Sequence, residues 1–446
     1  MAGLGFEILG LIEGSVGVGR RRREQKMRRL LIKNIAQIAT PKGTTLRKGS
    51  QMGEITCIQN GAIYIEDETI RYVGTMEEIL PKVLEDDFVT LDATGKCAVP
   101  GFVDSHTHFI FGGYRPEEFI MRLKGAGYLD IMKMGGGIWA SVQATREAGE
   151  KELLELGRKR LRKMLSQGVT TVEGKSGYGL DLITEQKQLQ VMKKLEREQP
   201  VSIVSTYLGA HAVPLEYKGR EDAYIDYMIE TVLPVIKEKE LAEFCDVFCE
   251  EGVFSISQSE KLLQAAKEQG FSVKLHADEI ITLGGGELAV TLGAASADHL
   301  LAVSEEGIRR LADAMTTATL LPCTAFCLDK PYAKARTMID AGCGIALASD
   351  FNPGSCFAGS IPLIFALAVI HMKMTIEEAL CAMTLNGAAA LNRSALIGSI
   401  EEGKQADLNL LEYPDYKFLV YHTDAQIIDT VIKKGEIVYG DRCENL

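Results

Sequence analysis

The chain has 446 residues, 46% of them hydrophobic, which is enough for a large core in about two or three domains, or in one large barrel with an appendage. Its formal net charge of −12 argues against nucleic acid or an anionic membrane as the main partner, because both need a basic surface, and favours a small-molecule ligand. The ten cysteines form no CxxC pair and no apolar run is long enough to span a membrane, so we expect a soluble, cytoplasmic protein with reduced thiols.

The N-terminal segment differs in composition from the rest of the chain. Its apolar part is interrupted by Glu7 and Glu13 and precedes the cluster Arg20–Arg23, which is the reverse of the order in a secretory signal. An arginine run of this kind is most often a solvated tail. We expect residues 1–26 to form a disordered leader outside the fold. We also hypothesise that Met27 is the native start, which the intact mass of the native protein tests.

Short β patterns occupy both ends of the remaining chain. From Leu30 to about Ala98, runs such as AIYIEDETIRYVG and FVTLDATGKCAVP are separated by Gly, Asp and Asn turns. The same pattern returns in ADLNLLEY and IIDTVIKKGEIVYG near the C-terminus. We therefore predict a small β-sandwich domain that is built from both chain ends, residues 27–98 and 397–442.

Between these segments, short apolar runs alternate with longer amphipathic stretches. The eight apolar runs are CAVPGFVDSH, GVTTVEG, VSIVSTYLGAH, FCDVFCEEG, SVKLHADE, ASADHLL, TATLLPC and GIALASDFN. Stretches such as KELLELGRKRLRKMLSQG, DAYIDYMIETVLPVIKEK and SQSEKLLQAAKEQG have helical periodicity, and several end in Gly. This α/β alternation predicts a (β/α)8 TIM-like barrel over residues 99–396. A doubly wound open sheet is the competing architecture, but it explains neither the count of eight nor the flanking β segments.

Histidines and a carboxylate close several of the predicted strands. His106 and His108 are two residues apart and would point to the same face of a strand, although a His-x-His pair alone is usually structural. His276, His299 and Asp350 end three later runs, and His211 follows another. In a (β/α)8 barrel the carboxyl ends of the strands form the active-site face, so we expect these side chains to converge there.

The donor atoms of this set suit a metal. His106, His108, His276 and Asp350 supply three neutral nitrogens and one carboxylate, which suits zinc or iron, Zn²⁺ or Fe²⁺/Fe³⁺, with one position left for water. A metal of this kind lowers the pKa of water toward neutrality. The sequence therefore predicts a hydrolytic metal site.

The run AVPGFVDSHTH, the later His276, His299 and Asp350, and the returning C-terminal β segment resemble the amidohydrolase superfamily. Binuclear members of that superfamily commonly carry a lysine at the end of strand four, where this chain has Cys249, Glu250 and Glu251. One metal is therefore expected.

A dense set of motifs makes the resemblance more specific. Within the superfamily, the segment from about Leu30 to Gly440 resembles enzymes of L-histidine degradation, and the motifs that carry the likeness are HTHFIFGGYRPEEF, MGGGIWASVQATR, EGKSGYGLD, LGAHAVP, LHADE, ADHL and SDFNPGSC. The resemblance implies hydrolysis of the cyclic amide of 4-imidazolone-5-propanoate to N-formimidoyl-L-glutamate. It also makes a homodimer plausible.

The same resemblance implies roles for further residues. Arg115 would hold the substrate carboxylate, which agrees with the bidentate geometry of a guanidinium. Tyr178 and His211 would contact the substrate, as would the residues that follow Asp350, namely Asn352, Gly354 and Ser355.

Three residues are candidates for the chemical steps. Glu279, three residues past His276, is close enough to the metal to orient or deprotonate the bound water, or to exchange a proton with a ring nitrogen, and it is also a predicted substrate contact. Asp350 can bind metal and accept the proton of water, and His299 can polarise the carbonyl or stabilise the developing oxyanion. The sequence leaves open whether Glu279 or Asp350 is the base.

Two other functions fit parts of this pattern. A guanine-type aminohydrolase would share the metal site, although its substrate has no carboxylate for Arg115 to bind. A non-catalytic scaffold would keep the barrel but typically loses metal ligands, all of which are present here.

Overall fold

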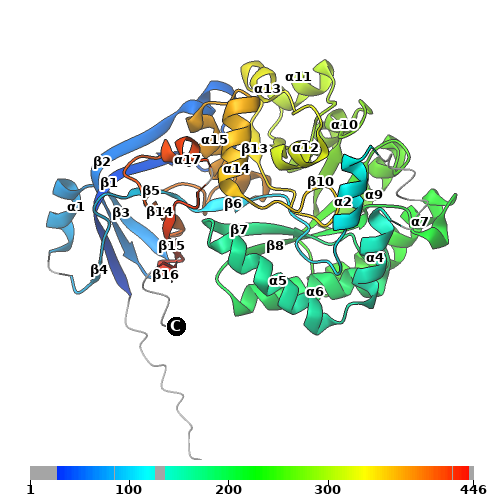
Figure 1. Cartoon of the computed structure of the whole chain (residues 1–446), viewed down its shortest axis with the longest axis horizontal. Helices are drawn as coiled ribbons and strands as arrows, with labels where there is room; N and C mark the ends of the chain where they lie inside the picture. The colour runs from blue at the N-terminus through cyan, green and yellow to red at the C-terminus, as the bar shows by residue number, and fades with distance from the viewer. Residues whose placement is uncertain (1–27, 85, 126–135, 424, 441–446) are drawn as a thin grey trace, which may run out of the picture.

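The computed structural model describes residues 28–84, 86–125, 136–423 and 425–440 (Figure 1). Two sheets organise these residues, a parallel barrel and a separate sheet at its side. The leader predicted for residues 1–26 lies outside the described residues. No helix in the described part of the chain is long and apolar enough to cross a membrane.

The barrel contains eight parallel strands in sequential order. Seven fall within the predicted runs, and β7 extends one residue beyond GVTTVEG, to Lys175. They are β6 (Phe102–Asp104), β7 (Val169–Lys175), β8 (Ser202–Ala210), β9 (Phe244–Cys249), β10 (Ser272–Ala277), β11 (Ser296–His299), β12 (Thr317–Leu320) and β13 (Ile345–Leu347). The strands are short and almost wholly buried, as expected for a parallel sheet covered by helices. The predicted (β/α)8 barrel is confirmed.

Helices connect and cover these strands (Figure 1). They are α2 (Pro116–Leu123), α4 (Ile138–Glu147), α5 (Glu150–Leu165), α6 (Leu182–Glu198), α7 (Glu221–Tyr227), α8 (Leu233–Glu238), α9 (Ile256–Glu268), α10 (Gly285–Leu292), α11 (Glu305–Asp313), α12 (Pro322–Leu328), α13 (Ala335–Ala341), α14 (Ile361–Ala366), α15 (Ile376–Met383) and α16 (Leu385–Ala390). Local sequence sets many of the ends: Ser255 caps α9 by accepting from the Gln258 N–H, and Gly342, with a φ of 104°, ends α13.

One predicted helix, residues 222–239, is divided in the structure. A π-helical segment, Met228–Val232, separates α7 from α8. Pro234 lies at the start of α8 and has no N–H to continue the regular ladder, so the preceding turn widens.

Hydrogen bonds at the carboxyl ends of β6 and β13 close the barrel. The Asp104 carboxylate accepts from the backbone N–H of Ser349 at 2.9 Å and from its hydroxyl at 2.6 Å. The Asp350 N–H then donates to the His106 carbonyl at 3.0 Å. The first and last strands therefore bring the His106 and Asp350 segments together.

The second sheet combines both ends of the chain, as predicted. Its strands are β1 (Arg29–Pro41), β2 (Ile55–Glu66), β3 (Thr69–Thr75), β4 (Val89–Asp92), β5 (Cys97–Pro100), β14 (Leu408–Leu411), β15 (Ile428–Lys433) and β16 (Glu436–Tyr439). In Figure 1 the red C-terminal strands lie beside the blue N-terminal ones, in the order β16-β15-β14-β5-β1-β2-β3. Alternate residues of β1 pack into different clusters, Leu30 and Ile32 in one and Leu31 in another with α1 (Met76–Val83). A short helix, α17 (Phe418–Tyr421), lies between β14 and β15.

The first predicted run, CAVPGFVDSH, is two strands rather than one. β5 pairs with β14 in the second sheet, whereas β6 pairs with β7 in the barrel. Gly101 joins them where a Cβ would fall 2.3 Å from Thr170 Oγ1, so the chain crosses between the sheets at a residue without a side chain. The domain boundaries at residues 98/99 and 396/397 stay a prediction.

Candidate metal centre

Three histidines converge at the carboxyl ends of the barrel strands. His106 and His108 follow β6, His276 lies near the end of β10, and one ring nitrogen of each lies within 4.8 Å of one nitrogen of each of the others. Asp350 Oδ1 lies 3.6 Å from His106 Nε2 and 3.5 Å from His108 Nε2. All four side chains are buried. The structure therefore brings the four predicted metal ligands together.

The unpaired atoms of this cluster fit a metal ion. His106 Nε2 and His276 Nε2 are buried without a hydrogen-bond partner among the described residues, whereas His276 Nδ1 faces Asp246 Oδ2 at 3.0 Å. A buried polar atom without a partner costs about 1–3 kcal/mol, which a bound cation would offset. Burial is the main cause that holds the pKa of His106, of His108 and of His276 well below the ordinary value, so the imidazoles are in the neutral form that binds metals.

Asp350 occupies a constrained position at the edge of this cluster. Its φ of 50° lies in the left-handed region, and its Oδ2 accepts a hydrogen bond of 2.6 Å from Thr324 Oγ1. Burial raises the pKa of Asp350 to about 7, against the lowering effect of the Thr324 hydrogen bond. The carboxyl group therefore changes protonation easily near neutral pH.

His299 and Glu279 lie beside the cluster. The His299 ring is 5.1 Å from the His276 ring, and His299 Nδ1 lies 3.5 Å from Glu279 Oε2. Burial lowers the pKa of His299 to about 4, so this imidazole is neutral at pH 7. Burial, with Asp350 and Glu250, raises the pKa of Glu279 to about 8, so its carboxyl holds a proton at pH 7. The pair thus offers a neutral imidazole and a carboxylic acid.

Two predicted substrate contacts, His211 and Tyr178, lie against His108. His211 lies on His108 with ring centroids 5.0 Å apart and planes 17° apart, and its Nδ1 is 3.0 Å from the Gly177 carbonyl oxygen. Tyr178 lies 5.2 Å from the His211 ring and 5.9 Å from the His108 ring. Burial raises the pKa of Tyr178, so its hydroxyl remains a donor at neutral pH.

Arg115, the residue predicted to bind the substrate carboxylate, lies in the loop after β6. Arg115 precedes α2, and its Nη2 rests so close to Gly354 that a Cβ there would fall 1.4 Å away. Its Nη1 lies 3.6 Å from Glu118 Oε2 and its Nε donates to the Pro353 carbonyl at 3.5 Å. Neither Nη group donates a hydrogen bond to another of the described residues, so both can take a further partner. Arg122 Nη2 donates to the Gly354 carbonyl at 2.8 Å and holds the two loops together.

Asn352 organises the loop that carries the other predicted contacts. Its Oδ1 accepts from the N–H groups of Gly354 and Ser355, each at 2.8 Å, and its Nδ2 donates to the Asp350 carbonyl at 2.7 Å. The carboxamide is thus used within the loop, while Gly354 and the partly exposed Ser355 lie at its surface.

Sequence reasoning missed five buried charged side chains next to the histidines, which are Glu173, Lys175, Asp246, Lys274 and Asp298. Asp298 Oδ2 lies 2.6 Å from His106 Nδ1, and Asp246 Oδ2 lies 3.0 Å from His276 Nδ1. The sequence did contain a signal for them. Glu173 and Lys175 are charged, lie two residues apart in an apolar run, and therefore share one face of the strand.

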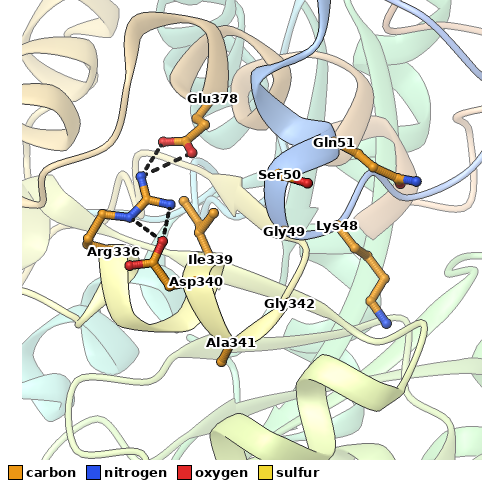
Figure 2. Close-up of a pocket in the computed structure, with 10 residues that line it drawn as sticks. All are labelled: Lys48, Gly49, Ser50, Gln51, Arg336, Ile339, Asp340, Ala341, Gly342 and Glu378. Carbon is orange, nitrogen blue, oxygen red and sulfur yellow. Dashed lines mark hydrogen bonds and ion pairs between the residues drawn. The ribbon is translucent and has the colours of Figure 1, made fainter.

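A surface pocket lies at the other end of the barrel (Figure 2). It is lined by the 3₁₀ helix Gly49–Gly53 and by α13, which leads into the amino end of β13. Figure 2 shows the Arg336 guanidinium between Glu378 and Asp340, at 2.9 and 2.8 Å. The described residues that line the pocket include none of the candidate site residues. Because barrel enzymes act at the carboxyl ends of their strands, the histidine cluster is the better candidate.

Known proteins resemble the chain over most of its length. A model of the Amidohydrolase family matches residues 97–438. Two similar curated relatives, both named imidazolonepropionase, come from Clostridium tetani (57% identical) and Parabacteroides distasonis (56%), and each alignment covers 92% of this chain and 98% of the relative.

Solved structures show the same fold. A mutant atrazine chlorohydrolase from Arthrobacter aurescens, complexed with zinc and atraton, aligns with a TM-score of 0.71 at 16% identity, over 92% of this chain and 95% of that one. Guanine deaminase from E. coli aligns with a TM-score of 0.71 at 14% identity, over 94% and 100%.

The chain belongs to the amidohydrolase family. Its high identity over nearly full length with the curated relatives places it, within that family, among the imidazolonepropionases.

Proposed function

We propose that the chain hydrolyses the cyclic amide of 4-imidazolone-5-propanoate to N-formimidoyl-L-glutamate, a step of L-histidine degradation. The observation that carries the proposal is the convergence of three neutral histidines with Asp350, together with the Arg115 guanidinium, whose Nη groups donate no hydrogen bond to the described residues. In the reaction the ring C–N bond breaks, the oxygen of water joins the carbonyl carbon, and a proton reaches the ring nitrogen. The names of the curated relatives support this activity.

The four clustered side chains His106, His108, His276 and Asp350 would hold one zinc or iron ion. When bound, such a metal polarises a carbonyl oxygen and lowers the pKa of water. Elemental analysis of the purified protein identifies the metal, and we expect about one equivalent per chain.

The loops beside the cluster would bind the substrate. Arg115 would receive the propionate carboxylate, because a guanidinium offers two parallel donors to a carboxylate. Tyr178 and His211, whose rings lie 5.9 and 5.0 Å from the His108 ring, would contact the substrate ring. The loop that Asn352 holds would contribute Gly354 and Ser355. Together these contacts would place the ring carbonyl near the cluster.

Three side chains would handle charge and protons. His299 is neutral and can donate an N–H to the carbonyl oxygen, where negative charge develops. The raised pKa of Glu279 suits a carboxylic acid that gives its proton to the departing ring nitrogen. Asp350 would accept the proton of the attacking water. The raised pKa of Glu279 favours this division of roles, in which Glu279 is the acid and Asp350 is the base.

The test is an ultraviolet assay of metal-analysed protein with freshly prepared imidazolone propanoate. Loss of the imidazolone absorbance with formiminoglutamate as product is the expected result. Release of ammonia from guanine would indicate an aminohydrolase instead, and binding without turnover would indicate a scaffold. We also propose a cytoplasmic homodimer, which sedimentation and cell fractionation test.

A further inference from the structure

The five buried charged side chains Glu173, Lys175, Asp246, Lys274 and Asp298, here called the charged cluster, lie in the barrel interior beside the histidines. They come from four strands, β7 and, beyond β8, the consecutive strands β9, β10 and β11. Each is fully buried, and a buried charge is costly unless it is paired. An apolar set of similar volume would often stabilise the fold as well, so the charges need a reason beyond stability.

Two carboxylates of the charged cluster face histidine nitrogens. Asp298 Oδ2 makes a hydrogen bond of 2.6 Å with His106 Nδ1. Asp246 Oδ2 lies 3.0 Å from His276 Nδ1, although not in the alignment of a hydrogen bond. A carboxylate next to Nδ1 favours the tautomer with its proton on Nδ1, which leaves Nε2 as the free electron pair.

A single ammonium group joins these two carboxylates. Lys175 Nζ lies 2.7 Å from Asp246 Oδ2 and 3.5 Å from Asp298 Oδ2, the same two oxygens that face the histidines. Its third contact is Glu173 Oε1 at 3.0 Å. Lys175 therefore links the Oδ2 atoms of two carboxylates on two different strands, while their Oδ1 atoms accept from the Val247 N–H at 2.7 Å and from Ser296 Oγ at 2.5 Å.

Lys274 and Glu173 complete the charged cluster. Lys274 Nζ donates to Glu173 Oε2 at 2.7 Å and to the Ser105 carbonyl at 3.0 Å, directly before His106 in the chain. Glu173 Oε1 also accepts from Thr206 Oγ1 at 2.5 Å. These bonds leave Lys175 little room to move.

A carboxylate oxygen of Glu173, one of Asp298 and a ring nitrogen of His106 lie within 4.8 Å of one another, a spacing that would suit a second metal. The ammonium groups already lie there, because Lys175 Nζ is 3.0 Å and Lys274 Nζ 2.7 Å from the Glu173 carboxylate. The charged cluster thus has the contacts of an orienting network and not those of a vacant cation site.

We propose that Lys175 is a positioning residue, which by bridging Asp246 and Asp298 fixes the rings of His106 and His276 with Nε2 directed to the metal. This inference rests on the proposed metal centre and adds the residues that prepare it. Neither Lys175 nor the two aspartates would touch the substrate.

The test measures Zn²⁺ affinity of the full chain by competition with a chromophoric chelator. Asp298→Asn and Asp246→Asn keep the side-chain shape and remove the charge, and we expect each to weaken Zn²⁺ binding by about 10–100-fold. Lys175→Met is expected to do the same through both histidines. The matched control is Asp407→Asn, which breaks an equally buried pair, with Lys433 at 2.7 Å, in the second sheet, and should leave Zn²⁺ affinity unchanged.

A second measurement does not depend on the variants folding. In the unsubstituted chain labelled with ¹⁵N-histidine, His106 and His276 should carry the proton on Nδ1 both before and after Zn²⁺ is added. Two results would overturn the inference while leaving the proposed function intact. One is a proton on Nε2 in the zinc-free chain. The other is Zn²⁺ binding by the Asp246→Asn and Asp298→Asn variants that is as tight as that of Asp407→Asn. An unsubstituted chain that binds no Zn²⁺ and no iron would overturn both.

Discussion

The guanidinium of Arg115 lies against Gly354, close enough that a Cβ at Gly354 would fall 1.4 Å from Arg115 Nη2. The loops after the first and last barrel strands therefore meet at a residue where a side chain cannot be placed without moving the guanidinium. Because Arg115 is proposed to bind the substrate carboxylate, a shift of the loop after the last strand should alter substrate binding.

Gly354→Ala should raise KM about 10–100-fold with a smaller change in kcat, since a hydrogen bond to a charged group contributes about 1.5–3 kcal/mol. Steady-state kinetics measure the split. Gly359→Ala in the same loop is the control, because its Cβ would meet only Phe351 Cδ2 at an ordinary 3.5 Å. An unchanged KM in Gly354→Ala would contradict the role of Arg115.

Substitution of a proposed metal ligand should remove metal and turnover together. His276→Ala and Asp350→Asn should each lower kcat/KM by on the order of a thousandfold or more, because a bound metal contributes several kcal/mol of transition-state stabilisation. Elemental analysis and kinetics are measured on the same samples. The exposed His371, which stacks on Tyr332, provides the control His371→Ala. Substantial turnover in a ligand variant that has lost its metal would disprove the assignment.

Glu279 should give the pH profile an alkaline limb. Burial raises the pKa of its carboxyl from 4.5 to about 8, so the proton is present at pH 7 and is lost as pH rises through about 8. We expect kcat/KM to fall above that pH. Glu279→Gln should be slower and should lack this limb; a variant that keeps the same limb would show that another group titrates.

The same pKa shift has a consequence for stability. A carboxyl whose pKa is raised by folding disfavours the folded state as pH rises between about 4.5 and 8, because the unfolded chain ionises first. Glu279→Gln in the metal-free protein should therefore lose less stability over this interval than the unsubstituted chain. Urea unfolding at about pH 4.5 and about pH 8 measures how much the free energy of unfolding changes in each protein.

Removal of the metal should lower both activity and thermal stability. Binding to the folded chain alone stabilises it by about 4 kcal/mol when the free metal is at a thousand times Kd. We expect chelation to abolish turnover, to lower Tm, and to be reversed by adding zinc or iron. Full activity in protein shown by elemental analysis to be metal-free would rule out the proposed mechanism.

Ser349→Ala should weaken the closure of the barrel. The Ser349 hydroxyl donates to Asp104 at 2.6 Å, and a hydrogen bond to a carboxylate contributes about 1.5–3 kcal/mol. Denaturant unfolding should show a loss of about that size. Ser141→Ala is the control, because Ser141 Oγ is buried without a hydrogen-bond partner among the described residues. Equal losses in the two variants would show that the Asp104 contact adds nothing.

Much of the architecture could be predicted because its signals are local. Alternation of short apolar runs with amphipathic stretches predicted all eight barrel strands, and the returning β pattern predicted a domain made from both chain ends. The division of one run at Gly101 was not predicted, because the reason lies in Thr170 on a neighbouring strand. Likewise, the break between α7 and α8 depends on where Pro234 falls in the helix.

The sequence by itself determined which residues stand at the carboxyl ends of the strands, because strand periodicity and the end of an apolar run are properties of neighbouring positions. That is why His106, His108, His276 and Asp350 could be named as one set. Only the tertiary structure decided what lies behind and beside them. Asp298 reaches His106 across 192 residues, because closing the barrel brings distant strands together. Such pairings depend on the relative position of whole strands and loops, which local patterns do not contain.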